Sequence, residues 1–362
     1  MCCLQVTDAC SRANRRAVPL VGSLRRLGCT IFRTVIRGST RKGAACPPPP
    51  PLSLSERSNP PSPNDDLPCQ HHSELARSLY PSLSSICNWF GEDDIRVVWE
   101  FPVSAGGFTD LRKGSLENRQ VAIKSYRRYL TADSSQISVR FAQEALVCSR
   151  LSHRHIVSFV GIYSTTTHPL SLVFKFAGHL DLRRYLKSHP TAKRLELLTG
   201  IARGLDHMHD LNIAHGRLET ENILVDFDGT AQIAGLGSAL ILGHTASQSE
   251  MSAGRLFRGI APELMRPEEY GFPYPQNSKA SDIYAFGVFT GHVAFSGRLE
   301  VLALHIMRND YQPTRPDHPE LTDQVWTAME QCWEGEPSKR TTIKQVIRVL
   351  EAGHISTVGA HN

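Results

Sequence analysis

The spacing of apolar and polar positions changes along this chain and divides residues 95–352 into two parts. The first part contains short runs rich in Val, Ile, Phe and Tyr, which are typical of β-strands. In the second part, Leu195, Leu198, Ala202 and Leu205 recur at intervals of three and four, on one face of an amphipathic helix. A strand-rich segment before a helix-rich segment predicts two lobes of one α+β unit. The predicted strands are IRVVWEFPV (95–103), RQVAIKSY (119–126), IVSFVGIY (156–163) and LSLVFKF (170–176), and the predicted helix is RLELLTGIARGLDHMHDLN (194–212).

The chain before residue 95 has a different composition. Residues 47–68 hold nine prolines in 22 positions, which remove backbone donors and favour an extended, solvated linker. Such a segment can also dock to aromatic grooves of partner proteins. Residues 1–43 mix arginines with apolar residues, and three interpretations stay open: a disordered basic arm, a mitochondrial targeting segment, or an arm on a membrane surface, with Cys2 and Cys3 as acylation sites.

Charge and cysteine content narrow the classes of function. The first 43 residues contain nine Lys and Arg against one acid, Asp8, whereas the whole chain has a net charge of +5, so the remainder is slightly acidic. This distribution argues against a broad nucleic-acid-binding surface. The nine cysteines have neither zinc-type spacing nor an even number, so we expect a reducing, cytoplasmic location. No apolar run long enough to predict a transmembrane segment occurs, and no secretory signal peptide is recognisable.

Seven short motifs follow one another in the part of the chain with strand and helix patterning. They are VSAGGFTDL (103–111), VAIK (121–124), IAHGRLETENILV (213–225), AQIAGLGSA (231–239), RGIAPELM (258–265), SDIYAFG (281–287) and CWEGEPSKRTT (332–342). Each is weak alone, but their order and spacing resemble a eukaryotic protein kinase domain of the tyrosine-kinase-like serine/threonine branch. The resemblance covers residues 95–352. It implies a small antiparallel β-rich N-lobe with one main helix and a larger helical C-lobe.

The resemblance also implies a nucleotide site. A glycine-rich hairpin covers the phosphates in the family, and here Gly106 matches while Ser104 and Thr109 occupy the outer glycine positions. Lys124 matches the lysine that binds the α- and β-phosphates. Glu144, in VRFAQEALVCSRL, matches the helix glutamate that pairs with this lysine. The residues expected to line an apolar adenine slot are Ala122, Val173 and Leu224.

The catalytic positions depart from the family pattern. Arg217 replaces the aspartate base, and a guanidinium cannot accept a proton from a substrate hydroxyl. Glu219 replaces the lysine that contacts the γ-phosphate. Gly235 replaces the aspartate that holds Mg²⁺, which leaves Asn222 as the remaining metal-ligand position. We therefore expect weak ATP binding at most, no Mg²⁺ site and no useful phosphoryl transfer.

Four matching residues are architectural in the family. They are His215 in the catalytic loop, Asp282, which fixes the backbone of that loop, and the pair Glu263 and Arg340. Their presence predicts that the larger lobe folds. After SDIYAFGVF, however, the chain continues as TGHVAFSG where the family's central helix runs about two turns longer. We expect either a weakened core or a misassigned exon boundary.

These observations predict a division of the chain and a function. The predicted parts are a basic Cys/Arg-rich arm (1–46), a Pro/Ser-rich disordered linker (47–72), a short helical lead-in (73–94), a kinase-like domain (95–352, N-lobe 95–176, C-lobe 177–352) and a tail (353–362). We interpret the domain as a pseudokinase that acts as a regulatory scaffold in signalling, with protein partners on its surface or on the linker. The alternatives are an active or weakly active ATP-dependent serine/threonine kinase and a decaying relic without a stable fold.

Overall fold

The computed structural model describes residues 81–98, 104–105, 109–127, 134–165, 170–179, 181–243, 259–290 and 315–359. The chain divides into two units, Met1–Pro63 and Asn64–Asn362, and every described residue belongs to the second. The arm and linker predicted for residues 1–72, the beginning of the lead-in and the last residues of the tail therefore lie outside the described part.

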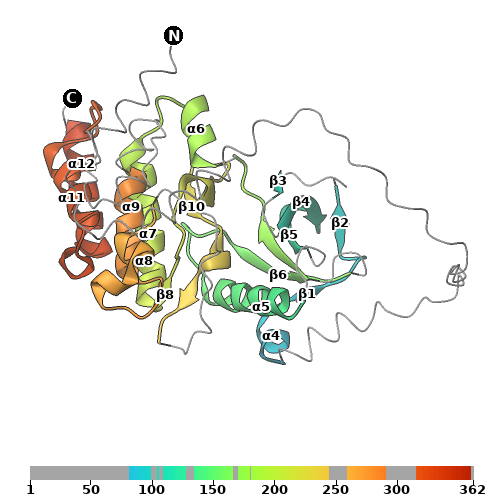
Figure 1. Cartoon of the computed structure of the whole chain (residues 1–362). Helices are drawn as coiled ribbons and strands as arrows, with labels where there is room; N and C mark the ends of the chain where they lie inside the picture. Colours follow the sequence, from blue (N-terminus) through green and yellow to red (C-terminus); the bar gives the residue numbers. More distant parts are fainter. Residues whose placement is uncertain are drawn as a thin grey trace, which may run out of the picture. The chain divides into compact units, whose positions relative to one another are not determined.

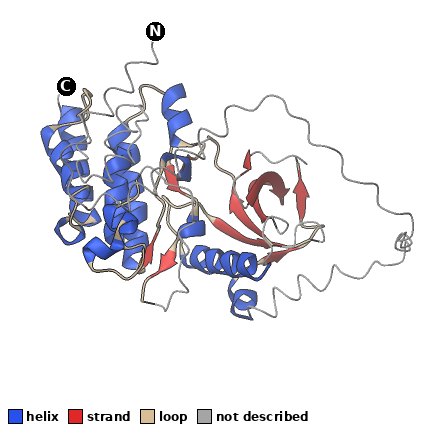
Figure 2. Ribbon diagram, in the orientation of Figure 1, coloured by secondary structure: helices blue, strands red, loops and turns tan. Residues whose placement is uncertain are grey.

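A seven-stranded sheet dominates the first half of this unit (Figures 1 and 2). Its strands are β1 (Trp89–Phe90), β2 (Ile95–Val97), β3 (Ser104–Ala105), β4 (Thr109–Leu116), β5 (Arg119–Tyr126), β6 (Phe159–Tyr163) and β7 (Ser171–Lys175). They are hydrogen-bonded in the order β1-β6-β7-β5-β4-β2, with β3 paired to β4. All neighbours are antiparallel except β1 and β6.

The hairpin of β4 and β5 determines which side chains face the site. Its two-residue turn, Glu117 and Asn118, has positive φ angles of 48° and 64°, which suit the right-handed twist of a tight hairpin. Along β5, Val121 and Ile123 are buried on one face of the sheet. Because side chains alternate along a strand, Lys124 points to the opposite face.

The main helix of this half, α5 (Ser134–Arg150), lies beside β6 (Figure 1). Phe141, Ala145 and Cys148 form its buried side, as the sequence pattern predicts. A short helix, α4 (Pro81–Ile86), packs against α5 and contributes Leu83 to the same core. The predicted helical lead-in is therefore helical at α4 and continues into β1.

Helices form most of the second half of the unit (Figure 2). They are α6 (Leu182–Ser188), α7 (Arg194–Asp210), α8 (Pro262–Met265), α9 (Lys279–Phe289), α11 (Asp323–Cys332) and α12 (Ile343–Gly359). Two strand pairs, β8 (Ile213–Ala214) with β11 (Leu240–Ile241) and β9 (Ile223–Val225) with β10 (Ala231–Ile233), frame the loops of the site. The described residues also include four short 3₁₀ segments: η4 (Thr220–Asn222), η5 (Leu236–Ser238), η6 (Pro267–Tyr270) and η8 (Pro337–Lys339). Helix α7 packs against α12, and α9 packs against α11.

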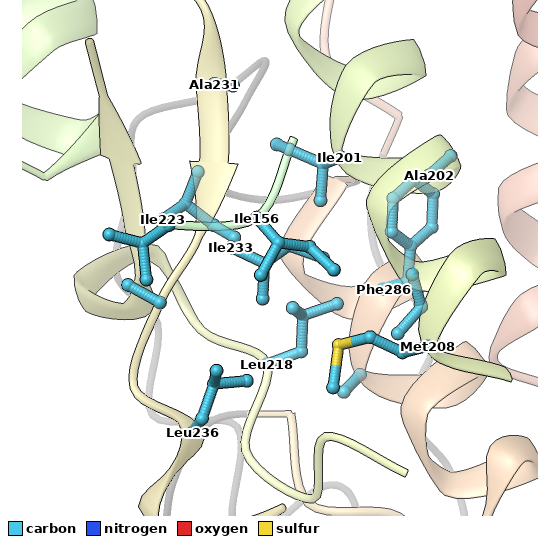
Figure 3. Close-up of a cluster of buried hydrophobic side chains, with 14 of the residues drawn as sticks. Ile156, Ile201, Ala202, Met208, Leu218, Ile223, Ala231, Ile233, Leu236 and Phe286 are labelled. Atoms are coloured by element: carbon cyan, nitrogen blue, oxygen red, sulfur yellow. The ribbon is translucent and has the colours of Figure 1, made fainter. Parts of the chain in front are cut away.

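Apolar side chains from both halves meet in one core (Figure 3). Ile156 follows α5, Met208 belongs to α7, Leu218 lies in the loop after β8, and Phe286 belongs to α9; each is at most 1% exposed. Full burial of such a side chain stabilises the fold by roughly 1.5–3 kcal/mol. The predicted α+β architecture, a strand-rich lobe followed by a helical lobe, is confirmed.

The structure also differs from the sequence predictions or leaves them untested. Strand β4 is not among the predicted strands; its first residues, 109–111, belong to the motif interpreted as the glycine-rich hairpin. Of the strand predicted for residues 95–103, Ile95–Val97 is observed, and residues 99–103 lie outside the described part. Helix α9 ends at Phe289, and residues 291–314 lie outside it as well, so the shortened central helix stays a prediction.

None of the helices that the structure describes combines the length and the apolar character needed to cross a membrane.

The expected pair of Glu263 and Arg340 joins α8 to the segment before α12. Arg340 Nη1 and Nη2 donate to the two carboxylate oxygens of Glu263 at 2.6 and 2.7 Å. Both side chains are nearly inaccessible to solvent, and Arg340 also donates to the carbonyl of Ala280. A buried carboxylate that loses its partner carries a desolvation cost without compensation.

We expect the substitution Arg340→Ala to lower the free energy of unfolding by about 3–5 kcal/mol, measured by urea denaturation. Arg203→Ala is the control, since Arg203 pairs with Glu351 at 2.7 Å on the exposed surface. That change should cost less than about 1 kcal/mol. Equal losses in the two variants would contradict the architectural role of Arg340.

Candidate nucleotide-binding site

Strand β5 and helix α5 bring Lys124 and Glu144 together. Lys124 Nζ donates to Glu144 Oε1 at 2.7 Å and to Oε2 at 2.8 Å. Glu144 is 3% exposed, and a buried carboxylate is stable only when it is paired or hydrogen-bonded. The side chain of Lys124 remains 20% exposed. Its ammonium can therefore bind an anionic ligand while Glu144 holds it.

The register between β5 and β7 determines which face of the sheet Val173 occupies. Val173 lies opposite Ile123 and packs in the cluster on the other face of the sheet from Lys124. Phe174 lies opposite Ala122 instead, so these two side chains share the face that carries Lys124. Val173 therefore faces away from Lys124, and Phe174, the next residue, shares the face of Ala122 and Lys124.

Ala122 and Leu224, the other two residues predicted for the adenine slot, come from different elements. Both are half-buried and pack against the main core cluster, Ala122 from β5 and Leu224 from β9. Ala122 and Phe174 share one face of the sheet, and an apolar surface of this kind can contact a nucleotide base. Gly106, the residue expected to cover the phosphates, lies outside the described residues.

The loop that follows β8 keeps a fixed backbone. The amides of His215 and Gly216 donate to the two carboxylate oxygens of Asp282 at 2.7 and 2.8 Å. His209 Nε2 lies 3.0 Å from the same carboxylate. Asp282 is 1% exposed, so these contacts satisfy a charge that would otherwise be costly to bury.

His215 is held in one tautomer by its neighbours. Its Nε2 lies 2.9 Å from the carbonyl of Ala234, which can only accept, and its Nδ1 accepts from the amide of Arg217 at 3.2 Å. A second proton on Nδ1 would oppose that amide. Burial lowers the pKa of His215, against an opposing effect of Asp282. The imidazole is therefore neutral at pH 7.

Arg217 and Glu219 pair with each other. Arg217 Nε lies 2.8 Å from Glu219 Oε1, within ion-pair distance, although its N–H is not aligned as a hydrogen bond. The family pattern places residue 219 near the γ-phosphate, but here the charge of Glu219 is compensated by the guanidinium. The carbonyl of Arg217 accepts from Asn222 Nδ2 at 2.9 Å, which orients the amide of Asn222.

Gly235 precedes η5 in the left-handed conformation, with φ 74° and ψ 34°. A Cβ added there would lie 2.2 Å from Asn222 Oδ1, so the amide of Asn222 fills the space beside this glycine. Leu236, the next residue, is buried as expected. At Gly237, an added Cβ would lie 3.2 Å from Glu144 Oε2, which places η5 beside the pair of Lys124 and Glu144.

The donor set around Gly235 does not fit Mg²⁺. Mg²⁺ in kinases is held by carboxylate and amide oxygens, and only Asn222 offers such an oxygen at the matching positions. The acids that follow Asn222 along the chain, Asp226 and Asp228, lie in the turn between β9 and β10, where Asp226 pairs with Lys175 at 2.7 Å and Asp228 with Arg154 at 3.5 Å. Within the described residues, no group of three or more His, Cys, Asp or Glu side chains could hold a metal ion.

A cavity of about 650 Å³ lies elsewhere than at the pair of Lys124 and Glu144. Its lining includes Cys87, Cys148 and Arg154, together with Asp226 and Asp228 of the turn between β9 and β10. The two aspartates are already paired with basic residues. Lys124 and Glu144 are absent from the lining, so this cavity is distinct from the candidate nucleotide site.

Comparison with known proteins agrees with this geometry. A family profile described as "Protein tyrosine and serine/threonine kinase" matches residues 98–350. "Serine/threonine-protein kinase STY17" of Arabidopsis thaliana is 24% identical over 263 residues, which are 69% of this chain and 43% of that protein. "Serine/threonine-protein kinase 12" of the same species is 28% identical over 247 residues, 64% of this chain and 51% of that protein. "Proline-rich receptor-like protein kinase PERK2", also of Arabidopsis, is 29% identical over 315 residues, 76% of this chain and 40% of that protein.

The profile match, the two-lobed fold and the pair of Lys124 with Glu144 define the class of protein. The chain belongs to the protein tyrosine and serine/threonine kinase family. It spans about half the length, or less, of the curated relatives described above.

The space beside Gly235 leads to a first prediction for this site. Gly235→Asp must displace the amide of Asn222 from the carbonyl of Arg217, which costs about one hydrogen bond, or roughly 1 kcal/mol. Gly243→Asp is the matched control, because Gly243 has a similar φ of 84° and nothing within 4 Å of an added Cβ. We expect the variant at 235 to unfold at lower urea concentration than the variant at 243. The reverse order would show that Asn222 does not fill this space.

The burial of His215 leads to a second prediction, on pH. Its folded-state pKa lies below the ordinary value of about 6.5, so on acidification the unfolded chain takes up a proton before the folded chain does. The free energy of unfolding should therefore fall as the pH is lowered from about 6.5 toward the folded-state pKa. His215→Gln should reduce this slope in urea melts between pH 7 and 5. An unchanged slope would mean that His215 does not contribute to it.

Proposed function

We propose that this domain is a pseudokinase, a protein kinase fold that binds and regulates partners without useful phosphoryl transfer. The observation that carries the proposal is the state of the two key positions. Arg217 stands at the position of the base and is paired with Glu219, while Gly235 stands at the position of the metal ligand and is packed against Asn222.

The loss of phosphoryl-transfer rate that each position would cause can be put in numbers. A positioned acid–base group contributes a factor of roughly 10² to 10⁴, and kinases turn over about 1–100 times per second. Loss of the base alone would leave a rate on the order of 10⁻⁴ to 1 per second. Loss of the metal ligand also removes electrostatic stabilisation of the transferring phosphoryl group, which is usually the largest contribution. The two losses together support an inactive domain.

Nucleotide binding is the part of the family's function that these residues still support. Lys124 would bind phosphate oxygens, and Ala122, Phe174 and Leu224 would contact the base. Without a metal to bridge the phosphates, the affinity for ATP should be weak and independent of Mg²⁺.

The alternative is an active or weakly active serine/threonine kinase. Two observations favour it: the relatives described above carry the name of protein kinase, and the pair of Lys124 with Glu144 is formed. Such an enzyme would need another group to orient the acceptor hydroxyl. Glu221 is exposed and contacts Thr220, while Asp226 and Asp228 are paired with basic residues, so they offer little support for this role.

The proposed scaffold would meet its protein partners through the kinase-like surface of residues 95–352 or through the proline-rich segment of residues 47–72. The relay of signals by protein contacts requires a folded C-lobe, and the buried pair of Glu263 and Arg340 supports such a fold. A relic without stable structure would show no cooperative thermal transition.

A thermal-melting experiment tests the proposal. ATP at ten times its Kd should stabilise the chain by about 1.4 kcal/mol, equally in EDTA and in Mg²⁺. Lys124→Met should abolish this stabilisation, and Lys344→Met, which changes an exposed lysine on α12, should retain it. In parallel, incorporation of labelled phosphate into a generic peptide should stay at the level of the Lys124→Met variant. A stabilisation that requires Mg²⁺, together with phosphate transfer above that level, would establish the alternative.

A further inference from the structure

Tyr126 lies at the centre of the contacts that hold Glu144 beside Lys124. Its hydroxyl donates to Glu144 Oε2. Its ring packs edge-on against Phe141, with ring centroids 5.8 Å apart and an interplanar angle of 88°. Lys124 Nζ lies 5.7 Å from the centroid of the same ring. One side chain thus contacts both members of the ion pair and the helix that carries the glutamate.

The spacing of these residues explains how the contacts arise. Lys124 and Tyr126 are two residues apart on β5, so they point to the same face of the sheet. Phe141 and Glu144 are three residues apart on α5, so they share one face of the helix. Tyr126 therefore connects the strand to the helix at the level of Glu144, and this was not recognised in the sequence because the family motif ends at Lys124.

The hydroxyl of Tyr126 can act only as a donor here. Burial, and then the negative charge of Glu144, raise the pKa of Tyr126 well above its ordinary value. The phenol therefore keeps its proton throughout the physiological range. A buried carboxylate gains more from such a donor than an exposed one, because water does not compete for its oxygens.

Gly237, in η5, also lies beside the carboxylate of Glu144. An added Cβ at Gly237 would lie 3.2 Å from Glu144 Oε2 and 3.4 Å from Lys124 Nζ. This neighbour brings no side chain to the carboxylate. The described hydrogen bonds to the carboxylate of Glu144 come from Lys124 and Tyr126. If Lys124 turns toward a phosphate, Tyr126 is the donor that stays.

We propose that Tyr126 is a positioning residue that keeps Glu144, and through it Lys124, oriented for nucleotide phosphates before nucleotide binds. The inference rests on the proposed nucleotide site and specifies how that site is kept in order. It also explains how the ion pair can persist in a domain whose metal-binding position is a glycine.

Tyr126→Phe is the direct test, because it removes the hydroxyl and keeps the ring on Phe141. The affinity for ATP in EDTA, measured by calorimetry, should fall about tenfold, as expected for loss of a hydrogen bond to a charged group. Tyr163→Phe is the matched control, since Tyr163 is a buried tyrosine of the same sheet that packs on its opposite face. The control should bind ATP like the parent chain.

A double variant separates positioning from a general loss of structure. In a Glu144→Ala background, which removes the acceptor, Tyr126→Phe should cause little further loss of affinity if the hydroxyl acts through the carboxylate. A full tenfold loss in that background would overturn the proposal, as would an unchanged affinity of the single variant.

Amide hydrogen exchange of the nucleotide-free protein keeps the test independent of the proposed function. Tyr126→Phe should accelerate exchange in α5 around Glu144 at least fivefold, and Tyr163→Phe should leave it unchanged. If the parent chain binds no ATP, the proposed nucleotide site is wrong, and exchange alone decides the role of Tyr126. Equal exchange in α5 for the parent chain and Tyr126→Phe would overturn that role.

Discussion

The geometry of the site depends on the hydrogen bonds that the buried carboxylate of Asp282 accepts. Asp282 lies in the first turn of α9 and accepts hydrogen bonds from the amides of His215 and Gly216. Because these bonds go to backbone groups, they hold the loop whatever side chains the loop carries. The chain could therefore exchange the residues at 217 and 219 without losing the path of the loop. This separation of backbone support from side-chain chemistry lets a kinase fold persist when its catalytic groups change.

The exchange at 217 and 219 also conserves local charge. The family pattern places a carboxylate and then an ammonium at these positions, and this chain places a guanidinium and then a carboxylate. The two still compensate each other at 2.8 Å. A guanidinium offers no proton acceptor at position 217, and its charge is compensated within the pair. A weak, metal-independent affinity for nucleotide is compatible with such a compensated pair.

Motif order was enough to predict the family, the two lobes and the partners of Asp282 and Arg340, because these depend on residue type and spacing. The face that a strand residue occupies depends on register, which the motifs do not contain, so the opposite faces of Val173 and Phe174 could not be assigned from the sequence. The pair of Arg217 with Glu219 could not be predicted, because each residue was compared separately with a family residue of the opposite charge. Tyr126 was missed because its partner is eighteen residues away along the chain, and only the packing of α5 on the sheet brings the two together.

Phe174 has a consequence for chemical probes of this protein. Its ring lies beside Ala122, is 8% exposed and contacts Phe159 at 5.7 Å between ring centroids. Ala122, Phe174 and Phe159 lie side by side across β5, β7 and β6. A compound that binds on the Lys124 face of the sheet would meet this row of apolar side chains, and a flat apolar scaffold would suit it.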